Sequence, residues 1–373
     1  MPTSSILLRE YVELAVETDR LSKSDVQSVL LGLFGEVGSI MASAKKLKRE
    51  GGAYVGYREI VEEEFGDAFW YLTALCRRLD ISIEEVLAGA SKNGKYQAAV
   101  AANDRVDGPL AEVSTAVLVP ALEAALLELG KAAADLLEIS PGVSARGRLE
   151  NFADNYLHAL QAAEVCFADV VHMNLRKVRG RFLAPIPGEL PTFDDNFPED
   201  ERLPAEFEIV IKQRKSGRTY LQWNGVFIGD PLTDQIRDPD GYRFHDALHF
   251  AHAAVLHWSP TFRGLIKHKR KSDPKADEAQ DSGRAIVVEE GLSAWIFARA
   301  KLLNLFEGQQ TVSLDLLKVV GQFVSGYEVE ACPLKLWEDA ILQGYAVFRQ
   351  LRANNGGIVI GSRVRRKVEY KPL

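Results

Sequence analysis

The chain of 373 residues carries a formal net charge of −7, and its 47% hydrophobic and 26% charged residues are typical of a globular protein. A negative chain has no overall attraction for nucleic acid or anionic lipid, so we expect neither nucleic acid nor a membrane as a partner. The three cysteines lie far apart, which excludes a disulfide framework or a cysteine-based zinc site and predicts a cytoplasmic location. We expect no signal peptide, and no stretch apolar for long enough to span a bilayer.

Residues 5–97 have apolar residues at helical spacing, interrupted by the glycines between residues 49 and 57. This pattern predicts a helical hairpin with flanking helices. Helical spacing returns over residues 120–181, where the sequence repeats the first segment faintly and in the same order. We therefore predict two tandem helical units, residues 1–105 and 115–182, the second degenerate. The aligned pairs are Glu36 with Glu128, Ser39 with Lys131, Glu64 with Asn151, and Asp67 with Asp154.

The remaining sequence changes character twice. Residues 183–204 contain five prolines and many acids, which predicts a connector. The sequence from Glu206 to Leu232 alternates and contains Ser-Gly and Asn-Gly turns, which predicts antiparallel strands. Helical spacing then runs from Tyr242 to about Asn354, and the last residues are expected to add a strand. The whole chain is predicted to be mostly α, with a helical domain at 205–373 that carries a small antiparallel β-hairpin insertion.

Four carboxylates interrupt the apolar helices of the first unit. Glu63, Glu64 and Asp67 lie at i, i+1 and i+4, so Asp67 shares a helix face with both glutamates. The glycine break lets the preceding helix fold back, which brings Glu36 opposite them. Converging carboxylates repel one another, and a hard divalent cation such as Mg²⁺ or Mn²⁺ removes that penalty. The alternative is a solvent-facing acidic surface, which suits Glu63 better than Glu36 or Asp67.

The motifs around these carboxylates resemble those of the MazG-like all-α nucleoside triphosphate pyrophosphohydrolases. That family carries E-x-x-E on one helix and E-x-x-D on the next, and these residues bind Mg²⁺ and the triphosphate. The second motif is complete as Glu64 and Asp67, whereas the first keeps Glu36 but has Ser39 in place of the second glutamate. The resemblance implies that Glu36, Glu64 and Asp67 bind the metal and that Glu63 joins them as a catalytic residue.

The same family ends its helical unit with Asn-x-x-Lys and a later Arg, which contact the substrate. The first unit has Asn93 but carries Tyr96 at the lysine position, whereas "NLRKVRGR" in the second supplies Asn174, Lys177 and Arg181. The resemblance implies that Asn93 and these three residues bind the substrate, in one nucleotide site shared by the two units. The alternative is a solvated basic helix end, which the helix dipole favours. The resemblance covers about residues 20–97 well and 120–182 faintly.

A second polar group lies in the C-terminal domain. His245, His249 and His252 occupy one helix stripe at i, i+4 and i+7, a spacing that zinc sites use. Three interpretations remain: a buried polar network, a second metal or phosphate site, or a ligand-sensing pocket. The segment from residue 224 onward resembles the C-terminal domain that accompanies some MazG-like proteins. The residues proposed for this second site are His245, Asp246, His249, Asp281, Arg284 and Glu289.

The resemblance implies a hydrolase that converts nucleoside triphosphates to monophosphates and pyrophosphate, with Mg²⁺ or Mn²⁺ as cofactor. One alternative is a catalytically weak nucleotide-binding regulator, because Ser39 removes one carboxylate of the motif. Another is a metal phosphohydrolase that uses the C-terminal His and Asp residues. The family's usual dimer makes a homodimer one arrangement to expect, and tandem units within one chain are the other.

Overall fold

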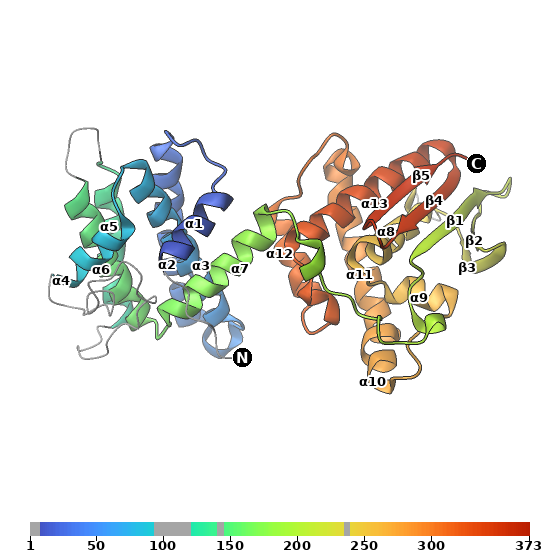
Figure 1. Cartoon of the computed structure of the whole chain (residues 1–373), viewed down its shortest axis with the longest axis horizontal. Coiled ribbons are helices and arrows are strands. Elements are labelled where there is room, and N and C mark those ends of the chain that lie inside the picture. Colours follow the sequence, from blue (N-terminus) through green and yellow to red (C-terminus); the bar gives the residue numbers. More distant parts are fainter. Residues whose placement is uncertain (1–7, 93–120, 140–144, 235–238) are drawn as a thin grey trace. The chain divides into compact units, whose positions relative to one another are not determined.

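The computed structural model describes residues 8–92, 121–139, 145–234 and 239–373 (Figure 1). The chain divides into two compact units, Met1–Leu183 and Ala184–Leu373, which we call unit 1 and unit 2. Helices dominate both units, so the prediction of a mostly α chain is confirmed.

Unit 1 is entirely helical over its described residues. Helix α2 packs against α3, α5 packs against α6, and α7 packs against α3. The Asp25 side chain caps α2 by accepting a hydrogen bond from the Ser28 amide at 2.9 Å. Both segments predicted as tandem units lie in this one compact unit, and their origin as two MazG-like units stays a prediction. The helices are α1 (Leu8–Thr18), α2 (Val26–Glu50), α3 (Tyr57–Arg78), α4 (Ile83–Lys92), α5 (Leu122–Leu136), α6 (Arg146–Ala162) and α7 (Phe167–Phe182).

An aromatic cluster joins four of these helices. Phe69 of α3 has its ring centroid 5.0 Å from that of Tyr11 in α1 and 4.9 Å from that of Phe167 in α7. Tyr156 of α6 stacks on Phe69 and meets Phe65 edge-on. The tyrosines and the α3 phenylalanines are fully buried, and aromatic side chains contribute the largest apolar area per residue to a core. The cluster therefore fixes α7 against α3.

Helix α2 bears on the expectation that no stretch of the chain is apolar for long enough to span a bilayer. Residues Val26–Ala53 are long and apolar enough to cross a membrane by length and composition, with a mean hydropathy of 1.4 in the most apolar window. The expectation that no stretch would pass this test is therefore wrong. Its buried residues Val29, Leu33, Val37 and Ile40 belong to the core of unit 1. Because core helices pass the same test, the result is weak evidence for a span.

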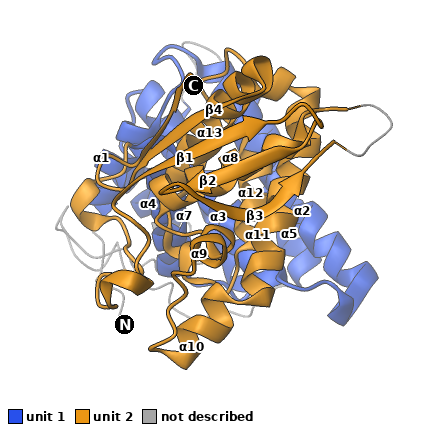
Figure 2. Ribbon diagram, turned by 90° about the vertical axis from the view of Figure 1, so that its right-hand side faces the viewer, with its two compact units in different colours: residues 1–183 blue, residues 184–373 orange. Residues whose placement is uncertain are grey.

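Unit 2 contains a five-stranded antiparallel sheet, larger than the predicted hairpin. Strand β4, near the end of the chain, pairs with β1, so that Ile209 lies opposite Val359, and the last strand β5 pairs with β4. Alternate residues Phe207, Ile209 and Ile211 of β1 are buried, as expected of a sheet with one face on the core. Figure 2 shows the sheet in front of α13 and α8. The strands are β1 (Glu206–Gln213), β2 (Thr219–Trp223), β3 (Val226–Leu232), β4 (Gly356–Ser362) and β5 (Lys367–Lys371), in the order β3-β2-β1-β4-β5.

Two helices of unit 2 are directly next to a π-helical turn. A π-helical turn, His252–Leu256, follows α8, and a second, Asp277–Asp281, precedes α11. Such turns often occur at functional sites, because the wider spiral redirects side chains. The helices are α8 (Asp246–Ala251), α9 (Pro260–Ile266), α10 (Pro274–Ala276), α11 (Gly283–Leu302), α12 (Leu314–Phe323) and α13 (Leu334–Asn354).

The proline-rich segment 183–204, predicted as a connector, packs into unit 2 through Asp194. This fully buried carboxylate accepts hydrogen bonds from Arg263 Nη2 at 2.6 Å, Arg363 Nη2 at 2.7 Å and the Leu203 amide at 2.8 Å. Burial acts to raise the pKa of Asp194, but the two guanidinium groups and the amide outweigh it and lower that pKa. The segment is therefore anchored to α9 and to the residue that follows β4.

We expect Asp194→Ala to destabilise unit 2 by about 3–5 kcal/mol, because two buried guanidinium groups would lose their counter-charge. Urea unfolding of the full chain followed by tryptophan fluorescence measures this, since four of the five tryptophans lie in unit 2. Asp200→Ala, at an exposed position of the same segment, is the control and should leave the midpoint unchanged. Equal midpoints for the two variants would show that the segment is not anchored by this carboxylate.

Candidate functional site

The first candidate site lies between α2 and α3. One carboxylate oxygen each from Glu36 of α2 and from Glu64 and Asp67 of α3 lie within 4.8 Å of one another. The two helices approach closely because Gly32 has no side chain: a Cβ there would lie 2.3 Å from the Tyr71 ring. The structure therefore brings together the three residues predicted to bind the metal.

The electrostatics of this group favour a cation. Burial, a hydrogen bond with Glu64 and the charge of Asp67 raise the pKa of Glu36 to about 8. Such a shift means that the three groups resist carrying three negative charges together. The donor atoms are all carboxylate oxygens, which is the ligand chemistry that Mg²⁺ and Mn²⁺ prefer. The residues present therefore fit a hard divalent ion.

Helix α7 brings basic and amide groups to the same carboxylates. Asn174 Nδ2 donates to Asp67 Oδ1 at 2.9 Å, and Tyr11 donates to Asn174 Oδ1 at 3.1 Å. Lys177 Nζ lies 2.5 Å from Glu63 Oε1 and also pairs with Asp67. Burial lowers the pKa of Lys177, but Asp67 and Glu63 outweigh it and raise that pKa. The first segment of unit 1 thus supplies the acids and the second supplies the lysine.

Close approach of α7 to α3 depends on Gly66. A Cβ at this position would lie 2.8 Å from the Asn174 Cβ and 3.2 Å from the Val170 carbonyl oxygen. Because the backbone oxygen cannot move aside, any larger residue would push the two helices apart. The glycine between Glu64 and Asp67 in "EFGD" therefore sets the distance at which Asn174 reaches the site.

Other predicted positions lie elsewhere. Arg181, on the last turn of α7, has its guanidinium 5.6 Å from the centroid of the Phe182 ring. Lys131 pairs with Glu128 on the exposed face of α5 at 2.7 Å. Asp154 is buried on α6. Asn93 and Tyr96 lie outside the described residues.

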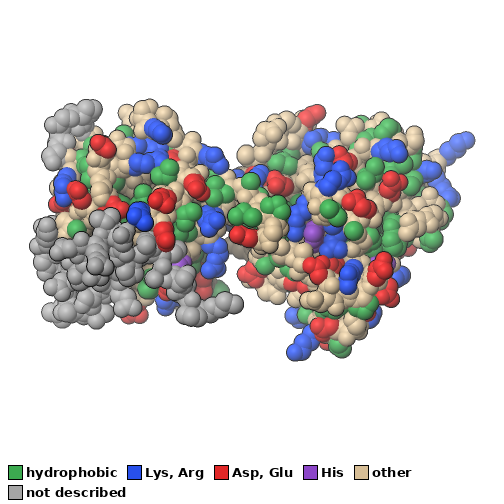
Figure 3. All heavy atoms as spheres, in the orientation of Figure 1, with side chains coloured by type: hydrophobic (Ala, Val, Ile, Leu, Met, Phe, Trp, Pro, Cys, Tyr) green, Lys and Arg blue, Asp and Glu red, His purple; other side chains and the backbone are tan. Residues whose placement is uncertain are grey.

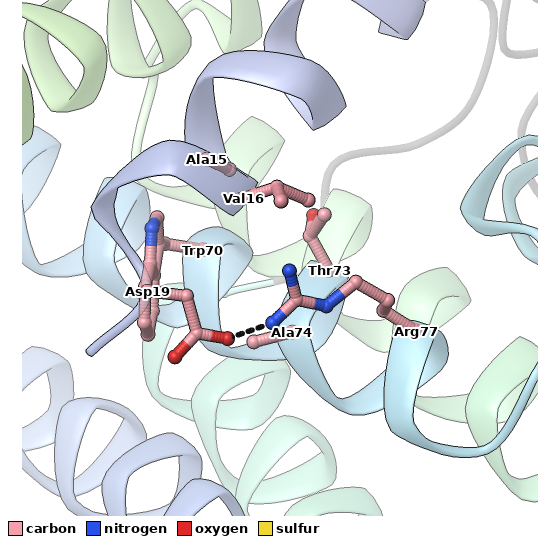
Figure 4. Close-up of a pocket in the computed structure, with 7 residues that line it drawn as sticks. All are labelled: Ala15, Val16, Asp19, Trp70, Thr73, Ala74 and Arg77. Atoms are coloured by element: carbon pink, nitrogen blue, oxygen red, sulfur yellow. Dashed lines mark hydrogen bonds and ion pairs between the residues drawn. The ribbon is translucent and has the colours of Figure 1, made fainter. Parts of the chain in front are cut away.

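A small pocket beside α1 has a packing role. Asp19 forms ion pairs there with Arg77 and Arg78, which tie the end of α1 to α3 (Figure 4). The pocket is lined by Ala15, Val16, Asp19, Trp70, Thr73, Ala74 and Arg77, and the predicted site residues are not among them. On the visible face of each unit, acidic and basic side chains are interspersed (Figure 3).

The histidines of unit 2 form a buried group against α11. His249 Nδ1 and His252 Nδ1 lie 3.1 and 2.9 Å from the same oxygen, Oε1 of Glu289. The other oxygen of Glu289 accepts hydrogen bonds from the Ser259 hydroxyl and the Thr261 amide. Burial acts to raise the pKa of Glu289, yet the two histidines outweigh it and lower the pKa to about 2. His249, His252 and Glu289 are nearly or fully inaccessible to solvent.

A second part of this group includes Glu290, which the sequence analysis missed. His245 Nε2 lies 3.4 Å from Glu290 Oε2, and His249 Nε2 lies 3.4 Å from Glu290 Oε1. Ligand atoms of His245, Asp246 and His249 lie within 4.8 Å of one another. The neighbouring Glu289 was the only signal in the sequence, and a run of two glutamates does not show which of them faces the histidines.

Two residues predicted for this second site belong elsewhere, which corrects the prediction. Asp281 is buried against arginines: Arg270 Nη2 donates to its Oδ1 at 2.7 Å, and Arg263 Nε lies 3.7 Å from the same oxygen. Asp281 is in the π-helical turn before the extended Ser282, so the regular phase of α11 does not apply to it. Arg284 is exposed, because five residues at about 100° each place it about 140° around the helix from Glu289.

Comparison with known proteins assigns the C-terminal half of the chain to a protein family. The family model of the MazG C-terminal domain matches residues 188–373. Unit 2 belongs to the MazG C-terminal domain family. This domain is consistent with a MazG-like protein and agrees with the resemblance that the motifs of unit 1 carry. The MazG C-terminal domain begins within the proline-rich segment, close to the start of unit 2 at Ala184. No curated protein and no solved structure matches the chain.

We expect the raised pKa of Glu36 to make unit 1 less stable at alkaline pH when a chelator removes divalent ions. The folded protein holds this proton more tightly than the unfolded chain, so the stabilisation is complete below about pH 4.5 and is lost as pH rises through about 8. Glu36→Gln, which keeps a neutral side chain of the same size, should remove this component of the pH dependence.

Urea unfolding of the full chain between pH 5 and 9, followed by circular dichroism, measures that component. The Asp194→Ala variant identifies the transition of unit 2, so the remaining transition reports on unit 1. Glu13→Gln, at an exposed position of α1, is the control and should keep the wild-type slope. A wild-type slope in Glu36→Gln as well would show that Glu36 holds no proton in this range.

Proposed function

We propose that unit 1 is a Mg²⁺-dependent nucleoside triphosphate pyrophosphohydrolase. The observation that carries the proposal is the convergence of Glu36, Glu64 and Asp67, with Asn174 and Lys177 contacting the two carboxylate oxygens of Asp67. The MazG C-terminal domain in unit 2 supports a nucleotide pyrophosphohydrolase-like role for the whole chain.

Glu36, Glu64 and Asp67 are the residues that would hold Mg²⁺ or Mn²⁺. A bound ion of this kind offsets phosphate charge and lowers the pKa of a coordinated water. Ser39 stands one turn after Glu36, where the family motif has a further glutamate, so this site offers one carboxylate fewer. Fewer carboxylates leave more coordination positions for phosphate oxygens and water.

Side chains of the protein position the substrate and receive the proton. Lys177 supplies an ammonium group for the triphosphate, which carries more negative charge than one divalent ion offsets. Asn174 fixes the orientation of Asp67 through its 2.9 Å hydrogen bond. Hydrolysis adds one water across the α–β anhydride, so that a monophosphate and pyrophosphate leave. We assign the proton from that water to Glu63, a carboxylate that pairs with Lys177 and lies outside the three-carboxylate group.

Asp67→Asn should abolish metal-dependent pyrophosphate release while the helical content of the chain stays unchanged. The substitution removes the negative charge of Asp67, which would bind the metal and which contacts both Asn174 and Lys177. Pyrophosphate release is measured with a panel of ribo- and deoxyribonucleoside triphosphates in Mg²⁺ or Mn²⁺. Asp169→Asn, at an exposed position of α7, is the matched control and should keep full activity. Wild-type release from Asp67→Asn would place the activity outside this site.

Lys177→Ala should have opposite effects on the affinity for Mg²⁺ and on the affinity for a nucleoside triphosphate. Mg²⁺ should bind more tightly, because the ammonium that pairs with Glu63 and Asp67 no longer competes. A non-hydrolysable triphosphate should bind more weakly, by about 1–3 kcal/mol for the loss of one charge-assisted contact. Isothermal titration measures both, and Lys131→Ala on the exposed face of α5 is the control. A parallel change in both affinities would contradict the proposed role of Lys177.

A nucleotide-binding regulator is the second candidate, and Ser39 is the observation that favours it. A site that has lost one ligand can retain nucleotide binding while turnover falls. The two functions separate in one assay: a regulator binds the non-hydrolysable triphosphate in Mg²⁺ but releases no pyrophosphate from any substrate in the panel.

A further inference from the structure

We propose that unit 2 holds a divalent transition-metal ion on α8, bound by His245, Asp246 and His249, whose ligand atoms lie within 4.8 Å of one another. This site is separate from the carboxylates of unit 1 and differs from them in chemistry, because it offers imidazole nitrogen as well as oxygen. Two histidines and one carboxylate are a donor set that Zn²⁺, Mn²⁺ and Fe²⁺ accept, whereas Mg²⁺ favours oxygen alone.

The ligand atoms of the three residues converge. One atom each of His245, Asp246 and His249 lies within 4.8 Å of the other two. Metal–ligand bonds of about 2.1 Å in a tetrahedral site place neighbouring ligand atoms about 3.4 Å apart, so small shifts bring the three atoms to the spacing that one ion requires. Glu290 borders the gap in front of the histidines: His245 Nε2 and His249 Nε2 each lie 3.4 Å from a different oxygen of its carboxylate.

The tautomer of His245 directs a lone pair into this gap. The Nδ1 atom of His245 lies 3.0 Å from the Tyr242 carbonyl oxygen, which can only accept, so Nδ1 carries the proton. Nε2 then has a free lone pair facing the Glu290 carboxylate. The Tyr242 ring stacks on the imidazole at 4.3 Å and 3° and holds its plane in place. A histidine fixed by a carbonyl at one nitrogen is the usual arrangement of a metal ligand.

Glu289 orients the second histidine in the same way. Its Oε1 lies 3.1 Å from His249 Nδ1, so His249 Nε2 is directed to Glu290. Because Glu289 also contacts His252, Ser259 and Thr261, its oxygens are already satisfied and it serves as a support, not a ligand. Carboxylates that hold a ligating histidine from behind are common in metal sites and raise the basicity of the imidazole.

An unpaired buried atom is the independent sign of a missing ligand. Asp246 is buried, and among the described residues its Oδ2 has no hydrogen-bond partner. The fully buried His249 contacts Glu289 and Glu290, although its ring nitrogens make no hydrogen bond of acceptable geometry within the described part of the chain. Buried polar atoms are nearly always paired, so Asp246 Oδ2 beside the histidines calls for an ion. The Glu290 side chain is 38% exposed, which gives the ion a route from solvent.

Co²⁺ is the probe for this site, because tetrahedral Co²⁺ absorbs visible light and replaces Zn²⁺ in sites of this type. The full chain carries Asp67→Asn throughout, which disables the unit 1 site and makes the result independent of the proposed function. After treatment with a chelator, the protein should bind one Co²⁺ with a visible absorption band, and Zn²⁺ should displace the band. Asp246→Asn should weaken Co²⁺ binding by roughly tenfold or more.

Glu278→Gln, at an exposed position of unit 2, is the matched control and should bind Co²⁺ as the parent does. Should Asp246→Asn change the circular dichroism spectrum, His245→Gln replaces it and should weaken binding to a similar degree. The proposal is overturned if the parent shows no visible band, or if the ligand variants and Glu278→Gln bind Co²⁺ equally. A proton on His249, instead of a metal, would then satisfy the contacts with Glu289 and Glu290.

Discussion

A carboxylate that leaves water must find a positive charge or a hydrogen-bond donor, and a guanidinium must find a negative charge or an acceptor. This constraint organises both units. In unit 2, Asp194 is matched by two arginines and Glu289 by two histidines. In unit 1, the Lys177 ammonium offsets part of the charge around Asp67, and the pKa of Glu36 rises because the compensation is incomplete. Complete compensation stabilises a fold, whereas incomplete compensation creates affinity for a cation.

The two buried charged groups of unit 2 differ in this respect. The group of Arg263, Arg270, Asp194 and Asp281 pairs each charge with a partner of opposite sign and fixes the proline-rich segment to α9. The histidine group lies on α8, beside a π-helical turn, and among the described residues Asp246 Oδ2 has no hydrogen-bond partner there. Both groups are rich in buried charge. The state of their hydrogen bonds, and not their composition, distinguishes an anchor from a binding site.

Local periodicity made much of unit 1 predictable. The i, i+3 relation of Glu64 and Asp67 follows from the helix itself, and the glycine break before Tyr57 predicted the hairpin that brings Glu36 near these two residues. Asn174 and Lys177 were found by the family resemblance, since nothing local links them to Asp67. The sequence separations here are 107 and 110 residues.

Unit 2 was less predictable because its strands and its buried charged groups join residues that are far apart in the sequence. Its sheet is completed by strands at the end of the chain, and β4 lies about 150 residues after β1, so alternation alone could not give the strand order. Asp281 was assigned to the wrong group because a π-helical turn changes the phase that a regular helix would keep. Glu290 was missed because adjacent residues on a helix point about 100° apart, and the sequence does not state which direction faces the histidines.

The sequence separation between Asp67 and Lys177 has a consequence for the folding of unit 1 during synthesis. A ribosome adds about 5–20 residues per second, so α3 is made roughly 5–20 s before the lysine that pairs with it. For most of that interval Phe65 and Phe69 lack Tyr156 and Phe167, the aromatic neighbours that contact them in the finished unit. The nascent chain therefore passes through a stage in which the aromatic face of α3 lacks the neighbours that α6 and α7 supply.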